Sequence, residues 1–228
     1  MTAALDRIAA LPRDRLLAEA SLWSADLLRM GEEVARSDLL VDIYHLDAAD
    51  GHFSPALLLF PDLVAQVRRA TDRPLHVHLM VEDAVLLAQV EQFADVGADL
   101  VSVHAENANA HEALDLIERR GLAGGVVLKL ETPVAAAAPF KGRVAMLTLL
   151  GTRIGVKGQR LDPSAGDRLR EARTLAGPGL LLGADGGIRE ATVPGLRAAG
   201  ADTVVMGSLA FNDPDLPARI SWVRAQRG

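Results

Sequence analysis

The sequence predicts an α/β protein with a (β/α)8 TIM-barrel fold, preceded by a short helical extension. From Ala20 onward, short apolar runs alternate with longer amphipathic runs, which is the pattern of parallel βαβ units. Eight such units fit in a chain of 228 residues, and α/β barrels of this length form one domain. The segments 94–103 and 198–205 also resemble each other, and each indicates the end of a helix, then a glycine, then a buried strand. We therefore expect one barrel domain over 19–228, with a doubly wound open sheet as the alternative.

The predicted extension covers residues 1–18. It mixes Ala and Leu with Asp and Arg and is interrupted by Pro12, which is typical of a short amphipathic helix followed by a connector. We expect this helix to pack on the outside of the barrel.

The barrel elements follow in order along the chain. The predicted strands are short apolar runs covering 20–23, 39–45, 75–79, 100–104, 123–129, 144–149, 180–184 and 203–206. The predicted helices between them include 61–70, 81–96, 108–119, 163–175 and 191–199. Gly97, Gly121 and Gly200 stand where three helices are expected to end. No Pro- or Ser-rich linker appears, so no second domain is predicted.

Composition excludes several classes of function. Lys and Arg total 24 against 30 Asp and Glu, and this net charge of −6 argues against nucleic-acid binding. No apolar run approaches the roughly 20 residues of a membrane span, and charged residues interrupt any signal-peptide core near the N-terminus. We expect a soluble cytoplasmic protein. Because the chain has no cysteine, a metal site would need His and carboxylate ligands, which favour Zn, Mn, Fe or Co.

Polar residues follow most of the predicted strands. His45 and Asp47 lie two apart, as do His76 and His78, and residues two apart on a strand share a face. Other strands end in His104, Glu106, Lys129, Glu131, Asp185 and Ser208. Each of these residues alone has an ordinary structural explanation. Together they predict a metal or acid–base centre, because barrel interiors otherwise favour Val, Ile and Leu and active sites lie at the C-terminal strand ends.

Several motifs, in this order, resemble those of the ribulose-phosphate 3-epimerase family. The similarity runs from about Ala20 to Phe211. The motifs are Ser21-Leu-Trp-Ser-Ala-Asp26 with Gly31-Glu-Glu-Val34, His45-Leu-Asp47 with Asp50-Gly-His-Phe53, His78-Leu-Met80, Val103-His-Ala-Glu106, Gly125-Val-Val-Leu128 with Thr132-Pro133, Asp185-Gly-Gly187 and Gly207-Ser208.

The resemblance implies a metal centre with two acid–base residues. In that family one divalent ion, commonly zinc, is held by two histidines and two aspartates, which match His45, Asp47, His78 and Asp185. The same aspartates act on opposite faces of C3 of the substrate, and the ion stabilises a cis-enediolate. Mn, Fe and Co remain alternatives to Zn.

The resemblance also implies which residues contact a phosphorylated substrate. Ser21, His78 and Met80 match residues that lie near the reacting centre. Gly186, Gly187, Gly207 and Ser208 match the phosphate-binding turns, and Gly155 and Gly158 lie in the loop that covers the substrate.

The chain departs from the family pattern at positions around the substrate. Ala49 and Leu150 stand where methionines are usual, His76 stands where an Asp is common, and the segment of Lys129 also differs. Arg153 and Lys157 add positive charge to the covering loop. We take these six residues as candidates for altered specificity, although an ion pair with Glu131 or another strand-end carboxylate is the simpler role for Lys129.

We therefore expect a metal-dependent epimerase that inverts C3 of a phosphorylated ketose. A pentulose 5-phosphate of the D-ribulose/D-xylulose type is the first candidate substrate, followed by a hexulose 6-phosphate or a tetrulose phosphate. A barrel decarboxylase or aldolase, including Schiff-base chemistry at Lys129, is a second enzyme hypothesis. A sugar-phosphate sensor without catalysis is the third. The family forms dimers or larger assemblies, so a homo-oligomer is expected.

Overall fold

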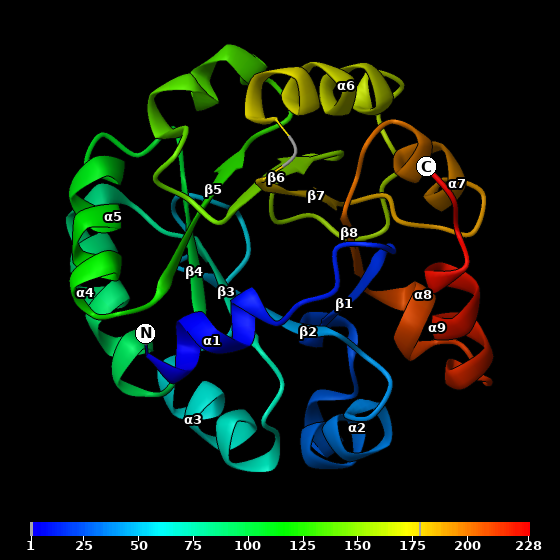
Figure 1. The fold of residues 1–228 in the computed structure, drawn as a ribbon. Helices are drawn as coiled ribbons and strands as arrows, with labels where there is room; N and C mark the ends of the chain where they lie inside the picture. The colour runs from blue at the N-terminus through cyan, green and yellow to red at the C-terminus, as the bar shows by residue number, and fades with distance from the viewer. Residues whose placement is uncertain (1, 178) are drawn as a thin grey trace.

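The computed structural model describes residues 2–177 and 179–228. Eight parallel strands close into a barrel in the order β1 to β8, with the helices around its outside (Figure 1). The strands are β1 Leu17–Ser21, β2 Ile43–Ala49, β3 Leu75–Met80, β4 Leu100–His104, β5 Ala123–Leu128, β6 Met146–Leu150, β7 Leu181–Asp185 and β8 Thr203–Met206. This confirms the predicted barrel and excludes the open sheet.

The α-helices are α1 Ala3–Ala9, α2 Met30–Ser37, α3 Pro61–Ala70, α4 Asp83–Asp95, α5 Ala110–Arg119, α6 Ala165–Ala176, α7 Val193–Ala198, α8 Ser208–Phe211 and α9 Leu216–Arg224. The 3-10 helices in the described part of the chain are η1 Leu22–Ser24, η2 Leu27–Arg29 and η3 Val134–Phe140. All five predicted helices are present within two residues at each end, and α3 has the predicted bounds. No helix among residues 2–177 and 179–228 is long and apolar enough to cross a membrane.

Two predicted strands were misplaced along the chain. The first begins at Leu17 and not at Ala20, since the Leu17 amide already donates to the carbonyl of Asp202 beside β8. The second begins at Ile43 and continues to Ala49, because the apolar run from Leu39 opens with a turn whose leucine is 84% exposed. His45 and Asp47 therefore lie within β2 and not at its end.

The inward-facing side chains change character along the barrel axis. At the N-terminal end, Ile8 and Leu11 pack with Leu17, Ile43, Leu100, Ala123, Met146 and Leu181 in an apolar cluster. Above it lies a buried polar layer of Glu19, His45, His76, Ser102 and Thr203, joined by hydrogen bonds. The outward-facing side chains pack with the helices in the main hydrophobic core. The C-terminal strand ends are thus the polar end of the barrel.

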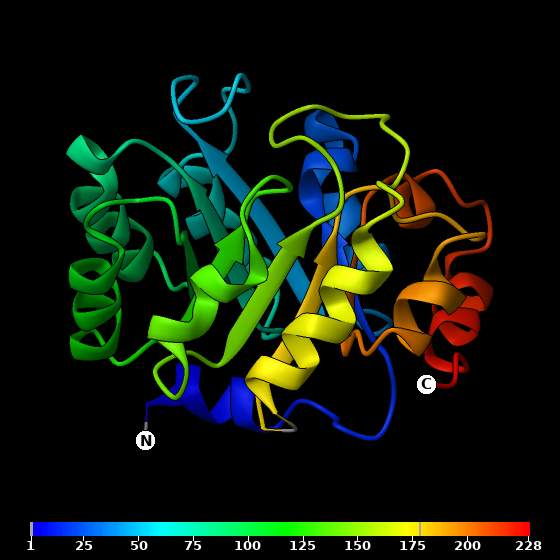
Figure 2. The same ribbon diagram turned by 90° about the horizontal axis from the view of Figure 1, so that it is seen from above.

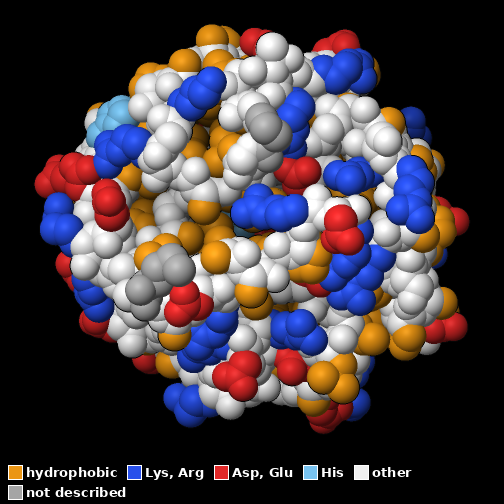
Figure 3. All heavy atoms as spheres, viewed as in Figure 1, with side chains coloured by type: hydrophobic (Ala, Val, Ile, Leu, Met, Phe, Trp, Pro, Cys, Tyr) orange, Lys and Arg blue, Asp and Glu red, His pale blue; other side chains and the backbone are white. Residues whose placement is uncertain are grey.

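The extension covers the N-terminal end of the barrel. Helix α1 lies across that end in Figure 1 and below the strands in Figure 2, whereas the β2–α3 and β6–α6 connections rise above the opposite end. Arg7 of α1 pairs with Asp99, 2.8 Å away, just before β4. On the face that carries α1, basic and acidic side chains are interspersed (Figure 3).

Asp42, just before β2, ties the two ends of the chain together. Its buried carboxylate accepts hydrogen bonds from Arg15 at 2.7 and 2.8 Å, from Arg224 of α9 at 2.8 Å and from the Ala18 amide at 2.9 Å. Burial raises the pKa of Asp42, but these partners outweigh burial and lower the pKa below its usual value of 3.8. The ionised carboxylate therefore stabilises the fold above pH 3.8, and this stabilisation is lost as the pH falls through the depressed pKa of the folded state.

Replacing Asp42 by asparagine is expected to lower the free energy of unfolding at pH 7 by about 2 kcal/mol, because charged hydrogen bonds from two arginines are weakened. The difference in free energy of unfolding between the variant and the wild type should shrink as the pH falls below 3.8. The wild-type carboxyl then becomes protonated and, like asparagine, carries no charge. Urea unfolding at both pH values measures this, with Asp72→Asn as the control at an exposed position. A difference that does not change with pH would contradict the assignment.

Candidate active site

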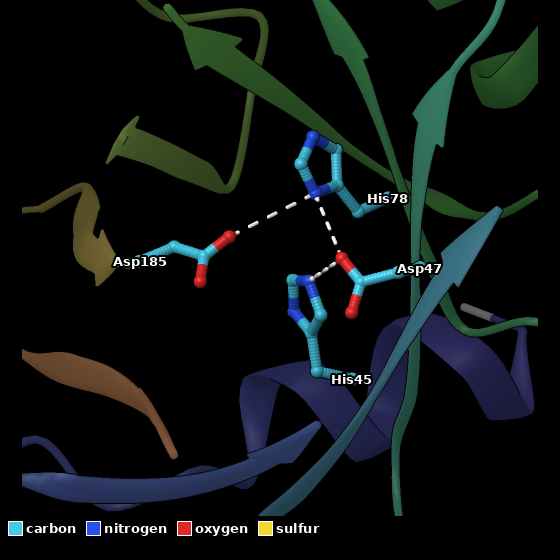
Figure 4. Close-up of side chains that lie close together, drawn as sticks. All are labelled: His45, Asp47, His78 and Asp185. Atoms are coloured by element: carbon cyan, nitrogen blue, oxygen red, sulfur yellow. Dashed lines mark hydrogen bonds and ion pairs between the residues drawn. The ribbon is translucent and has the colours of Figure 1, made fainter. Parts of the chain in front are cut away.

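The C-terminal strand ends bring together four side chains that are far apart in the sequence. His45 and Asp47 come from β2, His78 from β3 and Asp185 from β7, and the four point toward one another (Figure 4). One potential ligand atom from each lies within 4.8 Å of all the others. The structure thus gathers the four residues proposed from the resemblance.

The spacing within this cluster fits one small cation. Asp47 Oδ1 lies 3.1 Å from His45 Nε2 and 3.3 Å from His78 Nδ1, and His78 Nδ1 lies 3.9 Å from Asp185 Oδ2. Ligand bonds of 2.0–2.1 Å in a tetrahedral zinc site place the ligand atoms about 3.3 Å apart. Two imidazoles and two carboxylates are also ligand types that Zn and Mn accept.

His78 Nδ1 supplies a separate test of the metal site. This nitrogen is fully buried and has no hydrogen-bond partner among the described residues. A buried polar atom without a partner costs free energy, so such atoms usually have a role that the protein alone does not display. An unpaired ring nitrogen facing two carboxylates is what a metal ligand requires, and the donor set therefore fits a divalent ion.

The environments of the two aspartates drive their pKa values apart. Burial raises the pKa of Asp47, but the adjacent His45 and His78 outweigh burial and hold the pKa well below its usual range. Burial, together with the negative charge of Asp47, raises the pKa of Asp185 to about 6, although His45 and His78 oppose this. Paired carboxyl groups with separated pKa values are typical of acid–base catalysis.

A cavity of about 320 Å³ opens beside the four-residue cluster. Its lining includes Asp47 and Asp185 together with the predicted substrate residues Ser21, Met80, Gly155, Gly158, Gly186, Gly187, Gly207 and Ser208. Ser21 Oγ donates to Asp47 Oδ2 at 2.8 Å, so the serine contacts the cluster directly. A small phosphorylated sugar fits the scale of this cavity.

The turn after β7 leaves no room for side chains. Gly186 and Gly187 have φ values of +87° and +70°. A Cβ atom on Gly186 would lie 2.3 Å from the Thr152 hydroxyl, and one on Gly187 would lie 2.6 Å from Cα of Leu161. The backbone at this edge of the cavity can therefore approach a ligand closely.

The β6–α6 connection covers the cavity with basic residues. Lys157 Nζ donates to the Trp23 carbonyl at 2.6 Å and lies 4.6 Å from the centroid of the Trp23 ring. Burial lowers the pKa of Lys157, and the charge of Asp47 partly opposes this. Arg153 and Leu150, two other candidates for specificity, also line the cavity.

Three candidates for specificity lie outside the cavity lining. Ala49 is buried at the end of β2 and pairs in register with Met80, while His76 is fully buried in the polar layer below the cluster. Lys129 Nζ lies 3.5 Å from the centroid of the Phe53 ring. Among the described residues Lys129 forms no ion pair, so the predicted pair with Glu131 or another strand-end carboxylate was wrong. A cation–π contact takes its place.

Sequence reasoning missed several residues near the cluster. Glu19 lies directly below His45, and Trp23, Thr152 and Arg189 line the cavity. For Glu19 a signal was present, because a single acid within an otherwise apolar strand has to be paired when that strand is buried. The other three lie on loops and short helical turns, where no periodic pattern marks them.

Comparison with known sequences decides the family. The sequence profile described as the Ribulose-phosphate 3 epimerase family matches residues 17–211, which is most of the chain. The chain belongs to the ribulose-phosphate 3-epimerase family. Ribulose-phosphate 3-epimerase of Bacillus subtilis is 34% identical over 213 residues, covering 91% of this chain and 97% of that protein. The enzyme of the same name from Escherichia coli K12 is 31% identical, covering 90% of this chain and 93% of that protein. Family membership confirms the predicted resemblance and the prediction of an epimerase.

Comparison with solved structures supports the fold. A 3-hexulose-6-phosphate synthase superposes with a TM-score of 0.69 at 18% identity, covering 93% of this chain and all of that one. A 3-keto-L-gulonate-6-phosphate decarboxylase from Vibrio cholerae gives a TM-score of 0.70 at 15% identity, covering 93% of this chain and 97% of that one. At these identities the likeness concerns the barrel alone.

Proposed function

We propose that this family member is a metal-dependent epimerase that inverts C3 of a phosphorylated ketose, with D-ribulose 5-phosphate and D-xylulose 5-phosphate as the first candidate pair. The observation that carries the proposal is the four-residue cluster, in which the unpaired His78 Nδ1 faces carboxylates from two different strands. The relatives named above support the choice of a pentulose phosphate.

The two aspartates have the placement that inversion requires. Asp47 comes from β2 and Asp185 from β7, so the two carboxylates approach the cluster from different sides of the barrel (Figure 4). In the proposed reaction, one aspartate accepts the proton as the C3–H bond breaks. The other aspartate then donates a proton to the opposite face of the cis-enediolate, so that no oxidant or reductant is consumed.

His45, Asp47, His78 and Asp185 would hold the divalent ion, for which Zn is the first candidate and Mn, Fe and Co are alternatives. When bound, the ion supplies positive charge against the oxyanion that develops as C3 loses its proton. Ser21 holds Asp47 through its 2.8 Å hydrogen bond, which fixes the direction of this carboxylate. The glycine turns at 186–187 and 207–208 would receive the phosphate, and the loop with Gly155 and Gly158 would exclude water.

A proton-exchange screen tests the function and the substrate together. The metal-loaded protein is incubated in deuterated water with ribulose 5-phosphate, xylulose 5-phosphate, a hexulose 6-phosphate and a tetrulose phosphate, and NMR follows C3. We expect deuterium at C3 and appearance of the C3 epimer, fastest with a pentulose phosphate. Carbon–carbon cleavage or loss of CO2 would indicate the aldolase or decarboxylase instead, and binding without exchange would indicate a sensor.

A further inference from the structure

A fully buried carboxylate lies below the four-residue cluster, outside the set that would bind the metal. Glu19 Oε1 lies 2.8 Å from His45 Nδ1 and 2.5 Å from His76 Nδ1, and Thr203 Oγ1 donates to Glu19 Oε2 at 3.0 Å. Glu19, His45, His76 and Thr203 are all shielded from solvent. A charge at this depth is expensive unless every partner is in place, so Glu19 requires an explanation.

The hydrogen bonds of Glu19 fix where His45 carries its proton. An ionised carboxylate only accepts, so His45 and His76 both donate to it from Nδ1. His76 Nε2 can then accept from Ser102 Oγ, 2.7 Å away. In its neutral form, His45 has its lone pair on Nε2, the atom that faces Asp47 in the cluster.

A second carboxylate fixes His78 through a longer chain. Glu106 Oε1 accepts from the Lys129 amide at 2.9 Å, and Glu106 Oε2 lies 3.0 Å from His104 Nδ1. His104 therefore donates from Nδ1, and its Nε2 accepts from His78 Nε2 at 2.9 Å. The lone pair of His78 is left on Nδ1, which is the buried nitrogen without a partner.

We propose that Glu19 is a positioning residue for the metal ion, holding His45 with Nε2 aimed at the ion, and that Glu106 does the same for His78 through His104. The inference rests on the metal site of the proposed function but not on the identity of the sugar. The acid for His45 comes from β1, and the neighbouring position on β3 that pairs in register with His45 is His76. A carboxylate that holds a histidine ligand from behind also raises the basicity of the ligand.

Metal affinity of the stripped protein tests the proposal without an activity assay. Titration with Zn²⁺ against a chelating dye gives the affinity, elemental analysis gives the number of ions per chain, and Co²⁺ absorption reports the geometry. Glu19→Ala is expected to weaken binding about 10- to 100-fold, with a changed Co²⁺ spectrum. Glu19→Gln keeps an acceptor oxygen and the side-chain volume, so a loss of about 3- to 10-fold is expected. Glu106→Gln should weaken binding to a similar extent.

Rescue and matched controls separate positioning from general support of the fold. The double variant Glu19→Ala, His76→Asp moves the acid from β1 to β3 beside His45, and it should regain most of the affinity lost in Glu19→Ala. Asp42→Asn removes another buried carboxylate that contacts no residue of the cluster, and its affinity should stay within about twofold of the wild type. If Glu19→Ala does not fold, Glu19→Gln and Glu106→Gln still decide the outcome.

Three results would overturn the inference. Unchanged affinity and spectra in the Glu19→Gln and Glu106→Gln variants would show that neither carboxylate positions a ligand. A second ion per wild-type chain that disappears in Glu19→Gln would make Glu19, His45 and His76 a metal site in their own right, since these three also lie close enough to share an ion. A wild type that binds no divalent ion would remove the proposed metal site itself, which distinguishes failure of the function from failure of the positioning role.

Discussion

Replacing Asp185 by asparagine is expected to slow C3 epimerisation about 1,000-fold, the usual scale for losing an acid–base group. Asparagine keeps an oxygen that can face the metal, but it carries no proton to deliver. Without a bound ion, burial and the negative charge of Asp47 raise the pKa of Asp185 to about 6. Asp47→Asn should have an effect of similar size, because inversion needs a working group on each face of C3.

Isotope exchange distinguishes the two variants from each other. In deuterated water, a variant with one remaining base should exchange C3 of the epimer whose proton faces that base, without inverting it. Asp185→Asn and Asp47→Asn should therefore retain exchange with opposite epimers. Metal content is measured in each variant, and Asp72→Asn, at an exposed position, is the control. Full epimerisation by either variant, or exchange of the same epimer by both, would contradict a two-base mechanism.

Removal of the divalent ion is expected to have the second large effect. Dialysis against a strong chelator should lower kcat/KM about 1,000-fold, because no fixed cation then opposes the charge that develops on the substrate oxygen. Adding back Zn²⁺, Mn²⁺, Co²⁺ or Fe²⁺ in turn should restore activity, and the order of restoration identifies the preferred ion. The ion should also raise the melting temperature, since a ligand that binds only the native state adds about 2.7 kcal/mol of stability at 100 times its Kd.

Two variants control this experiment. His45→Ala removes a proposed ligand, so added metal should restore little activity. Lys129→Ala removes a lysine that lies over Phe53 outside the cavity lining, and it should respond to metal as the wild type does. Full activity in the chelated wild type would overturn the metal-dependent reaction. Loss of metal-restored activity in Lys129→Ala alone would favour the Schiff-base alternative.

Local patterns in the sequence predicted the barrel and a polar centre at its strand ends, whereas the set of four clustered residues came from the resemblance to the family. Alternating apolar and amphipathic runs indicate βαβ units. Two polar residues two positions apart, such as His45 and Asp47, are predicted to share a face of a strand even when the predicted ends of that strand are wrong. Although β2 was placed four residues too early, both side chains remain on one face of the strand. An error in where a strand begins or ends does not matter here, because residues two positions apart share a face wherever the ends of the strand lie.

Contacts between distant segments could not be predicted in this way. Glu19 lies below His45 because the register of β1 against β2 pairs Ser21 with His45. The predicted strand at 20–23 did not include Glu19, so it was not placed there. Lys129 was assigned an ion pair with Glu131 or another strand-end carboxylate because a buried lysine at the barrel mouth needs a partner, whereas the folded chain places the ring of Phe53 beside it. Both outcomes depend on the direction in which a side chain leaves its loop or strand.

The N-terminal cover of the barrel has a consequence for the order of events during synthesis. Helix α1 is synthesised before the barrel strands, yet Ile8 of α1 and Leu11 after it find their apolar partners on strands as late as β7, at Leu181. Strand β1 likewise needs β8, which ends at Met206, to complete its pairing, and Glu19 needs Thr203 of β8. Contacts between segments so far apart in sequence form slowly. We therefore expect the packing of α1, the pairing of β1 with β8 and the hydrogen bond between Thr203 and Glu19 to form late, after nearly the whole barrel has been translated.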